Sequence, residues 1–218
     1  MRTDEPDREE LRAAALEAAA RGWRVFPLRP GTTDPAVQDW QRRATSEPDR
    51  LNAAWDHGSY NVGVAVCPSG LVVLDLFPSR PGERPPARFR SPGITDGADV
   101  LAELADTAGA RFPSETLTVL TPEGGRQLYF THPQRRCPRT STGVDSPLGW
   151  HVGIRSAGAF VALAPSVTGQ GVFQVVHDGP VAEWPDFVAR RIPARALSAR
   201  CPGSLAERQT RQAPLPFG

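Results

Sequence analysis

The sequence predicts an α+β domain in which helices cover one side of a mixed or antiparallel sheet. Two patterns lead to this class. Helical segments and short strands alternate in the first half of the chain, and consecutive short strands fill the second half. A third observation is the composition: 39% apolar residues with 23 prolines and 20 glycines indicate a folded centre with loop-rich edges.

Three segments have helical patterns. The first starts with acidic residues, continues with alanines and ends at Gly22, as the helix dipole and the C-cap geometry favour. In the second, Ser46 is the expected N-cap and Pro48 lies in the first turn. The third is amphipathic. The segments are residues 6–23, 47–56 and 96–109.

Short apolar runs bounded by turn residues predict the strands. The runs at 61–66 and 71–77 flank the sequence CPSG, which predicts a hairpin with Gly70 in the left-handed conformation. Residues 115–132 read as two strands around a PEGG turn. The other expected strands are 23–28 and three within 150–167 and 171–179, while 78–95 is expected to be a Pro/Arg-rich loop.

Length and composition predict one domain over residues 1–189 and a disordered tail over 190–218, which has no apolar stripe. The net charge is +1 and no lysine is present, so any nucleic-acid contact must come from local arginine clusters. The acidic N-terminus is unlike a signal peptide, and the widely spaced cysteines lack metal-binding spacing. We therefore expect a cytoplasmic protein with reduced thiols and no membrane partner. The cysteines are Cys67, Cys137 and Cys201.

The strand LVVLDLF places one acid, Asp75, at its end. Side chains alternate between faces along a strand, so residue 77 is expected on the same face as Asp75. A metal site would need a second carboxylate there, and the chain has Phe77. A lone Asp at a strand end is usually a turn or cap residue, so the wider context has to decide its meaning.

Four stretches in order resemble the N-terminal domain of bifunctional DNA primase/polymerases, the prim-pol group of the archaeo-eukaryotic primase superfamily. The second stretch, for example, is similar to the family pattern in which S-G-L-V-V-L-D is followed by an apolar residue and a second Asp. The resemblance runs from about Ala14 to about Phe187. The stretches are AARGWRVFPLRPGTTDPAVQDWQRRAT, NVGVAVCPSGLVVLDLF, TLTVLTPEGGRQLYF and LGWHVGIRSAGAFVALAPSV.

The resemblance implies template-directed nucleotidyl transfer with two divalent metals, held by an Asp-x-Asp pair and a third Asp, and a histidine on the phosphates. Asp75 matches the first acid. The other three positions carry Phe77, Gln127 and Gly153, and the lysine expected after PG is replaced in the Thr33–Asp34 region. We therefore expect the catalytic site to be degenerate and no cofactor to be needed, with Mg or Mn required only if activity is retained.

Residues that fit a binding role remain. Arg155 matches an arginine of the family pattern and Ser166 its terminal serine, and a guanidinium group recognises phosphate without metal. Gly125 in the glycine turn is a third phosphate candidate, although the turn lacks the lysine and helix of a Walker motif. His151 is expected on the face of residue 153, where it would be a substitute metal ligand. Two arginine clusters are candidates for nucleic-acid backbone contact: Arg80, Arg84, Arg88 and Arg90, and Arg135, Arg136 and Arg139.

Three functions stay open at this point. The first is a degenerate primase/polymerase-like domain that keeps nucleotide or nucleic-acid binding, or has a regulatory role in DNA replication with a replication-related protein partner. The second is an active template-directed primase/polymerase with a rearranged metal site. The third is a protein-interaction module without nucleotide binding, which gains weight if Phe77 fills the metal pocket.

Overall fold

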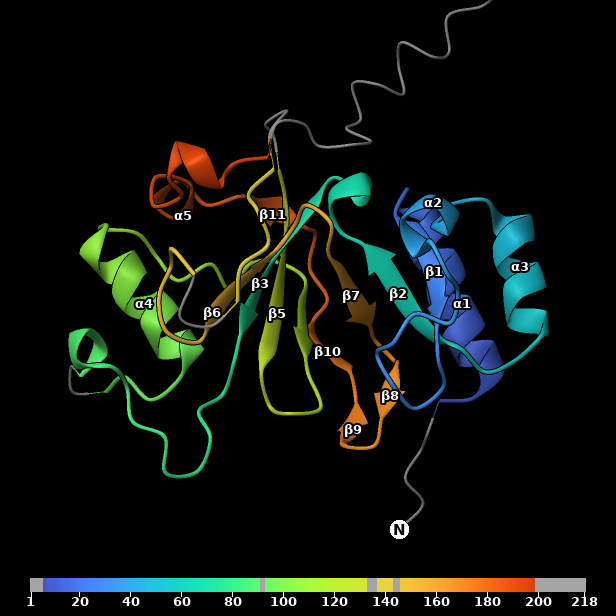
Figure 1. Cartoon of the computed structure of the whole chain (residues 1–218), viewed down its shortest axis with the longest axis horizontal. Coiled ribbons are helices and arrows are strands. Elements are labelled where there is room, and N and C mark those ends of the chain that lie inside the picture. The colour runs from blue at the N-terminus through green and yellow to red at the C-terminus, as the bar shows by residue number, and fades with distance from the viewer. Residues whose placement is uncertain (1–5, 91–92, 133–136, 143–145, 199–218) are drawn as a thin grey trace, which may run out of the picture.

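The protein, here a computed structural model that describes residues 6–90, 93–132, 137–142 and 146–198, contains two sheets flanked by helices. The sheets lie in the middle of the molecule, and the longer helices lie at its two outer flanks (Figure 1). The predicted α+β class is confirmed. In the described residues no helix is long and apolar enough to cross a membrane.

A three-stranded antiparallel sheet forms one half of the core. Its middle strand is β2, between β1 and β7. Helices α1 and α3 pack against this sheet through a shared apolar cluster. The elements are α1 (Arg8–Ala20), β1 (Arg24–Leu28), α3 (Pro48–Asp56), β2 (Asn61–Ala65) and β7 (Phe160–Leu163).

Helix α1 begins and ends as the sequence predicts. Asp7 and Glu10 form a reciprocal capping box at its start, which satisfies two free backbone N–H groups. Gly22 follows its end with φ 82°. The N-cap of α3 is Glu47, so the assignment of Ser46 was wrong by one residue. Pro48 occupies the first helical position, where its missing N–H costs nothing, and this makes its predecessor the cap.

A larger sheet forms the other half, with strand order β10-β4-β5-β3-β6 and β11 pairing with the end of β5. All of its pairs are antiparallel except β5 with β11. Helices α4 and α5 pack on it. The elements are β3 (Leu71–Leu76), α4 (Gly97–Thr107), β4 (Thr118–Leu120), β5 (Arg126–Thr131), β6 (Val152–Arg155), β10 (Gln174–His177), β11 (Ala182–Glu183) and α5 (Asp186–Ala189).

The predicted strands exist, but the predicted hairpin at 61–77 does not. Strands β2 and β3 do not pair, because β2 lies between β1 and β7 whereas β3 lies between β5 and β6. The 3₁₀ turn Cys67–Ser69 and Gly70, with φ 74°, carry the chain from one sheet to the other. The four family-like stretches therefore lie in two sheets.

Short elements complete the chain. Residues 150–179 hold five strands rather than the expected three, because two of them, β8 and β9, form a separate small ribbon. Helix α2 lies between β1 and α3, where no helix was predicted. The elements are α2 (Trp40–Arg43), β8 (Val167–Thr168), β9 (Gly171–Val172) and the 3₁₀ turns Ala87–Phe89 and Ala194–Ala196.

The structure describes only the first part of the predicted tail. Within the predicted tail, residues 190–198 include a 3₁₀ turn, and Arg139 donates its N–H to the carbonyl of Ala196. Residues 199–218 lie outside the described residues.

Cys67 is buried and free, whereas Cys137 is disulfide-bonded, so the expectation of reduced thiols is wrong for Cys137.

Strand β3 is covered on both faces. Val72, Leu74 and Leu76 point toward α4 and its apolar cluster. Leu71 and Val73 point the other way, into the cluster shared with the three-stranded sheet. Alternation along the strand places Asp75 on this second face, between the two sheets. The fold thus buries the motif acid in the layer where the sheets meet.

The asparagine that opens the second family-like stretch, Asn61, has a structural role. It is fully buried at the start of β2, where its side-chain N–H donates to the carbonyls of Thr32 (2.8 Å) and Val167 (2.5 Å). Its Oδ1 accepts the N–H of Val167 at 2.9 Å. One side chain therefore holds two loops against the edge of the three-stranded sheet.

We predict that Asn61→Ala lowers the free energy of unfolding by about 2–3 kcal/mol, because it leaves buried backbone groups without partners. Urea denaturation followed by circular dichroism measures this. Asn52→Ala is the matched control, since that amide makes a single hydrogen bond within the described residues, which it accepts from Arg12 at 2.8 Å, and its loss should cost less than about 1 kcal/mol. Equal costs for the two variants would contradict the assignment.

Candidate functional site

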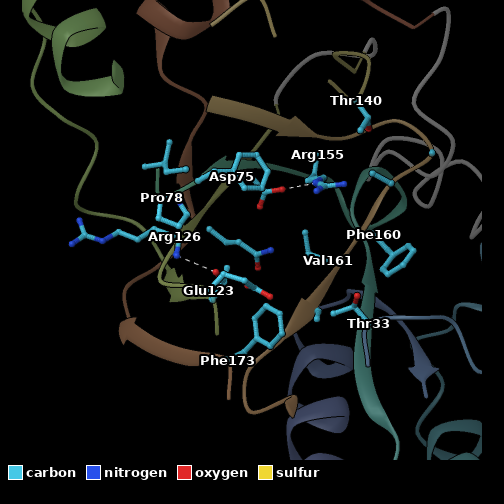
Figure 2. A pocket seen from close by; sticks show the side chains of 18 residues that line it. Thr33, Asp75, Pro78, Glu123, Arg126, Thr140, Arg155, Phe160, Val161 and Phe173 are labelled. Atoms are coloured by element: carbon cyan, nitrogen blue, oxygen red, sulfur yellow. Dashed lines mark hydrogen bonds and ion pairs between the residues drawn. The ribbon is translucent and has the colours of Figure 1, made fainter. Parts of the chain in front are cut away.

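A cleft of about 490 Å³ opens between the two sheets and contains the motif acid. Strands β3, β5 and β6 supply one wall, and residues of β7 supply the other. In Figure 2, Asp75 and Arg155 lie beside each other on the first wall, with Phe160, Val161 and Phe173 across from them. The site therefore combines charged groups from one sheet with apolar groups from the other.

Three of the predicted motif positions lie side by side. Asp75 on β3 is the register partner of Gln127 on β5 and of Gly153 on β6. Residues opposite one another in an antiparallel sheet have side chains on the same face, about 5 Å apart. Three stretches of the chain, with Asp75 and Gly153 more than seventy residues apart, are thus brought to one row across the sheet.

Phe77 and Gly153 fill the place where the second and third acids would lie. A β-carbon built on Gly153 would lie 3.0 Å from Cε2 of Phe77 and 3.4 Å from Cβ of Asp75. The phenyl ring therefore lies directly against the glycine, and the glycine leaves room for the ring. A side chain on residue 153 would therefore press on the Phe77 ring, and the ring would have to move.

Asp75 is 4% exposed and has an arginine partner. Arg155 Nε donates to Asp75 Oδ2, and Gln127 also hydrogen-bonds the carboxylate. Tyr129 in turn donates its hydroxyl to Oε1 of Gln127 at 3.2 Å, which orients the amide. Burial raises the pKa of Asp75, and Arg155 and Gln127 offset part of this increase. Burial and the nearby Asp75 charge raise the pKa of Tyr129.

These residues do not fit a pair of divalent cations. Two cations need several carboxylates to offset their mutual repulsion, and Asp75 is already neutralised by Arg155. The adjacent ring of Phe77 offers no oxygen ligand. Within the described part of the chain, no three His, Cys, Asp or Glu side chains are grouped so that they could hold a metal ion.

The profile of the N-terminal domain of bifunctional DNA primase/polymerases matches residues 15–187 of this chain. The chain belongs to this prim-pol family. No curated protein matches the chain closely enough to count as a relative. The prim-pol match spans both sheets and every residue that lines the cleft, including Asp75, Phe77 and Gln127.

Two other predicted residues, Ser166 and Gly125, have structural roles in this prim-pol domain. Ser166 is fully buried and accepts the N–H of Val62 at 2.9 Å, so it does not reach a phosphate. Gly125 lines the cleft, but its N–H donates to Oγ1 of Thr121 at 3.1 Å. The PEGG segment is the predicted hairpin turn, since Thr121 and Gly125 are joined by a backbone hydrogen bond.

His151 is not brought beside Asp75. It precedes β6 in a left-handed conformation with φ 58°, which breaks the strand alternation that the sequence reading assumed. Its Nε2 lies 2.9 Å from Oε1 of Glu83, which also accepts the indole N–H of Trp150 at 3.3 Å. The Glu83 contact anchors the Pro/Arg loop to the start of β6. Of the arginine clusters, Arg135 and Arg136 lie outside the described residues.

The structure adds residues that the sequence reading missed. Glu123 and Arg126, at the tip and end of the β4–β5 turn, line the mouth of the cleft. The charge of Glu123 reaches Asp75 and contributes to its raised pKa. Thr33 and Phe160 line the opposite wall (Figure 2). Glu123 directly precedes the paired glycines of the motif, and this proximity was the only sequence signal for it.

We predict that Gly153→Ala costs about 1–3 kcal/mol of stability, because the new methyl group presses on the Phe77 ring. In a Phe77→Ala background the same change should cost less, with a coupling energy of about 1 kcal/mol. Urea denaturation of the four proteins measures the cycle. Gly169→Ala is the matched control, since a β-carbon there meets nothing within 4 Å. A cost that is the same in both backgrounds would refute the contact.

We predict that Arg155→Ala lowers stability by about 3 kcal/mol at neutral pH, because a buried carboxylate loses its partner. Without the guanidinium, the pKa of Asp75 rises further, so the carboxyl becomes neutral on acidification and the missing partner matters less. The difference between wild type and variant should therefore shrink as the pH falls from about 7 toward about 4.

Denaturation at several pH values tests this dependence. Adding Asp75→Asn should remove it, because no titrating group then faces residue 155. Arg190→Ala, at an exposed residue just after helix α5, serves as the control for loss of one arginine. A pH-independent cost of Arg155→Ala would show that Asp75 is not its partner.

Proposed function

We propose that this prim-pol domain binds a nucleotide or a nucleic-acid end in its cleft without transferring a nucleotidyl group, and that it acts in DNA replication as a binding or regulatory module. The observation that carries the proposal is the packing of Phe77 against Gly153, beside an Asp75 that is neutralised by Arg155. The positions of two metal-binding acids hold an apolar contact instead. The parts of a catalytic site act together, so such losses reduce turnover by orders of magnitude.

The cleft supports binding because it stays open and keeps polar groups. Its volume of about 490 Å³ lies in the range of small-molecule sites. The side chain of Arg155 is 32% exposed, so its guanidinium is accessible from the cleft although its Nε is bound to Asp75. Arg126 adds an exposed cation at the mouth, and Phe160 adds an aromatic wall. This set matches the phosphate and base of a nucleotide.

We predict that a nucleoside triphosphate binds to the purified chain by isothermal titration calorimetry, and that Arg126→Glu weakens the binding on the order of tenfold. The reversal places a negative charge at the mouth of the cleft. Arg111→Glu makes the same charge change at an exposed position that does not line the cleft, and should leave the affinity unchanged. Primer extension with Mg or Mn should be undetectable.

Two results would contradict the proposal. Template-directed extension that disappears in Asp75→Ala would show an active polymerase with a rearranged site, in which Glu123 is the nearest additional carboxylate that lines the cleft. Absence of any nucleotide or nucleic-acid binding would leave the protein-interaction module, and a protein partner retained after nuclease treatment would then support that reading.

A further inference from the structure

A second hollow of about 420 Å³ lies beside the cleft, over the start of β1 and helix α2. Its polar lining consists chiefly of Arg24, Arg42 and Gln41, and Trp40 gives it an aromatic wall. None of these residues coincides with a position to which the family pattern assigned chemistry. The hollow therefore needs its own explanation.

The charge of this hollow is positive and uncompensated. No Asp or Glu is among the residues that line it. Arg24 and Arg42 make no ion pair with any residue that the structure describes, whereas some other arginines, such as Arg12 and Arg21, do. In a protein with a net charge of only +1, two unpaired guanidinium groups in one concave site are suited to phosphate.

The hollow continues into the cleft. Both are lined by Gly158 and Ala159, which connect β6 to β7. Gly158 is exposed with φ 75°, and a β-carbon there would meet nothing within 4 Å. At this residue, no side chain separates the hollow from the cleft. Phe160 of the cleft also contacts Trp40 of the hollow, with ring centroids 5.0 Å apart. The two sites therefore share one low wall.

We propose that a single nucleic-acid strand lies across Gly158, with one nucleotide in the cleft and a neighbouring phosphate held by Arg24 and Arg42. The inference rests on the proposed binding function of the cleft and extends it to a second subsite. Each space is of small-ligand size, which fits the successive nucleotides of one strand. Arginine on the backbone together with an aromatic wall is the usual chemistry of sequence-independent single-strand binding.

Fluorescence anisotropy on the full chain tests the subsite with a labelled thymidine dodecanucleotide, and competition with a thymidine mononucleotide reports on the cleft alone. The double variant Arg24→Ala/Arg42→Ala should bind the dodecanucleotide on the order of tenfold more weakly. Its salt slope should fall by about 0.7, because one phosphate contact is lost. Mononucleotide affinity should be unchanged.

The control Arg8→Ala/Arg190→Ala removes the same charge at exposed positions far from both sites and should leave both affinities unchanged. Arg42→Glu, at an exposed helix position, repeats the test without altering β1. An equal loss in the control, an unchanged salt slope, or equally tight binding of a phosphopeptide would overturn the subsite. If the mononucleotide binds and the dodecanucleotide binds no more tightly, the subsite is refuted and the proposed function of the cleft stands. If neither binds, the proposed function fails first.

Discussion

The carboxylate of Asp75 is buried between two packed sheets, and the rest of the site depends on the guanidinium group of Arg155 that pairs with it. Taking a carboxylate out of water costs several kcal/mol unless an opposite charge and hydrogen bonds replace the solvent. Arg155 supplies the charge and Gln127 a hydrogen bond, and Tyr129 fixes the amide. Arg155 lies on β6, whereas Gln127 and Tyr129 lie on β5, and both strands pair with the strand that carries Asp75. The register of the sheet therefore determines the electrostatic environment of the carboxylate.

The apolar half of the site is built around the same row. Phe77 and Gly153 are complementary, because the ring uses the space that only a glycine leaves open. In this prim-pol domain the negative charge of Asp75 is balanced by the positive charge of Arg155. An acid that is already paired, beside a phenyl ring, offers divalent cations little uncompensated negative charge.

The two-sheet arrangement explains why a repacked centre still leaves an open cleft. The charged row belongs to the larger sheet, whereas Phe160 and its neighbours belong to the smaller one, and the connection through Gly158 is exposed between them. The separate walls let the interior of one sheet change its chemistry while the space between the sheets persists. The same connection lines both the cleft and the arginine-lined hollow, so the two spaces adjoin each other.

The sequence by itself determined the class, most strands and the longer helices, because these follow from short-range periodicity and turn residues such as Gly22 and Gly70. It also identified Asp75, Phe77, Gln127 and Gly153 as one group, through a family resemblance. Only the tertiary structure decided that β2 and β3 belong to different sheets and that Arg155 binds Asp75. It also decided that Ser166 binds the backbone of Val62 and that His151 contacts Glu83. Those outcomes depend on contacts between residues tens of positions apart and on a left-handed turn at His151, which local pattern does not specify.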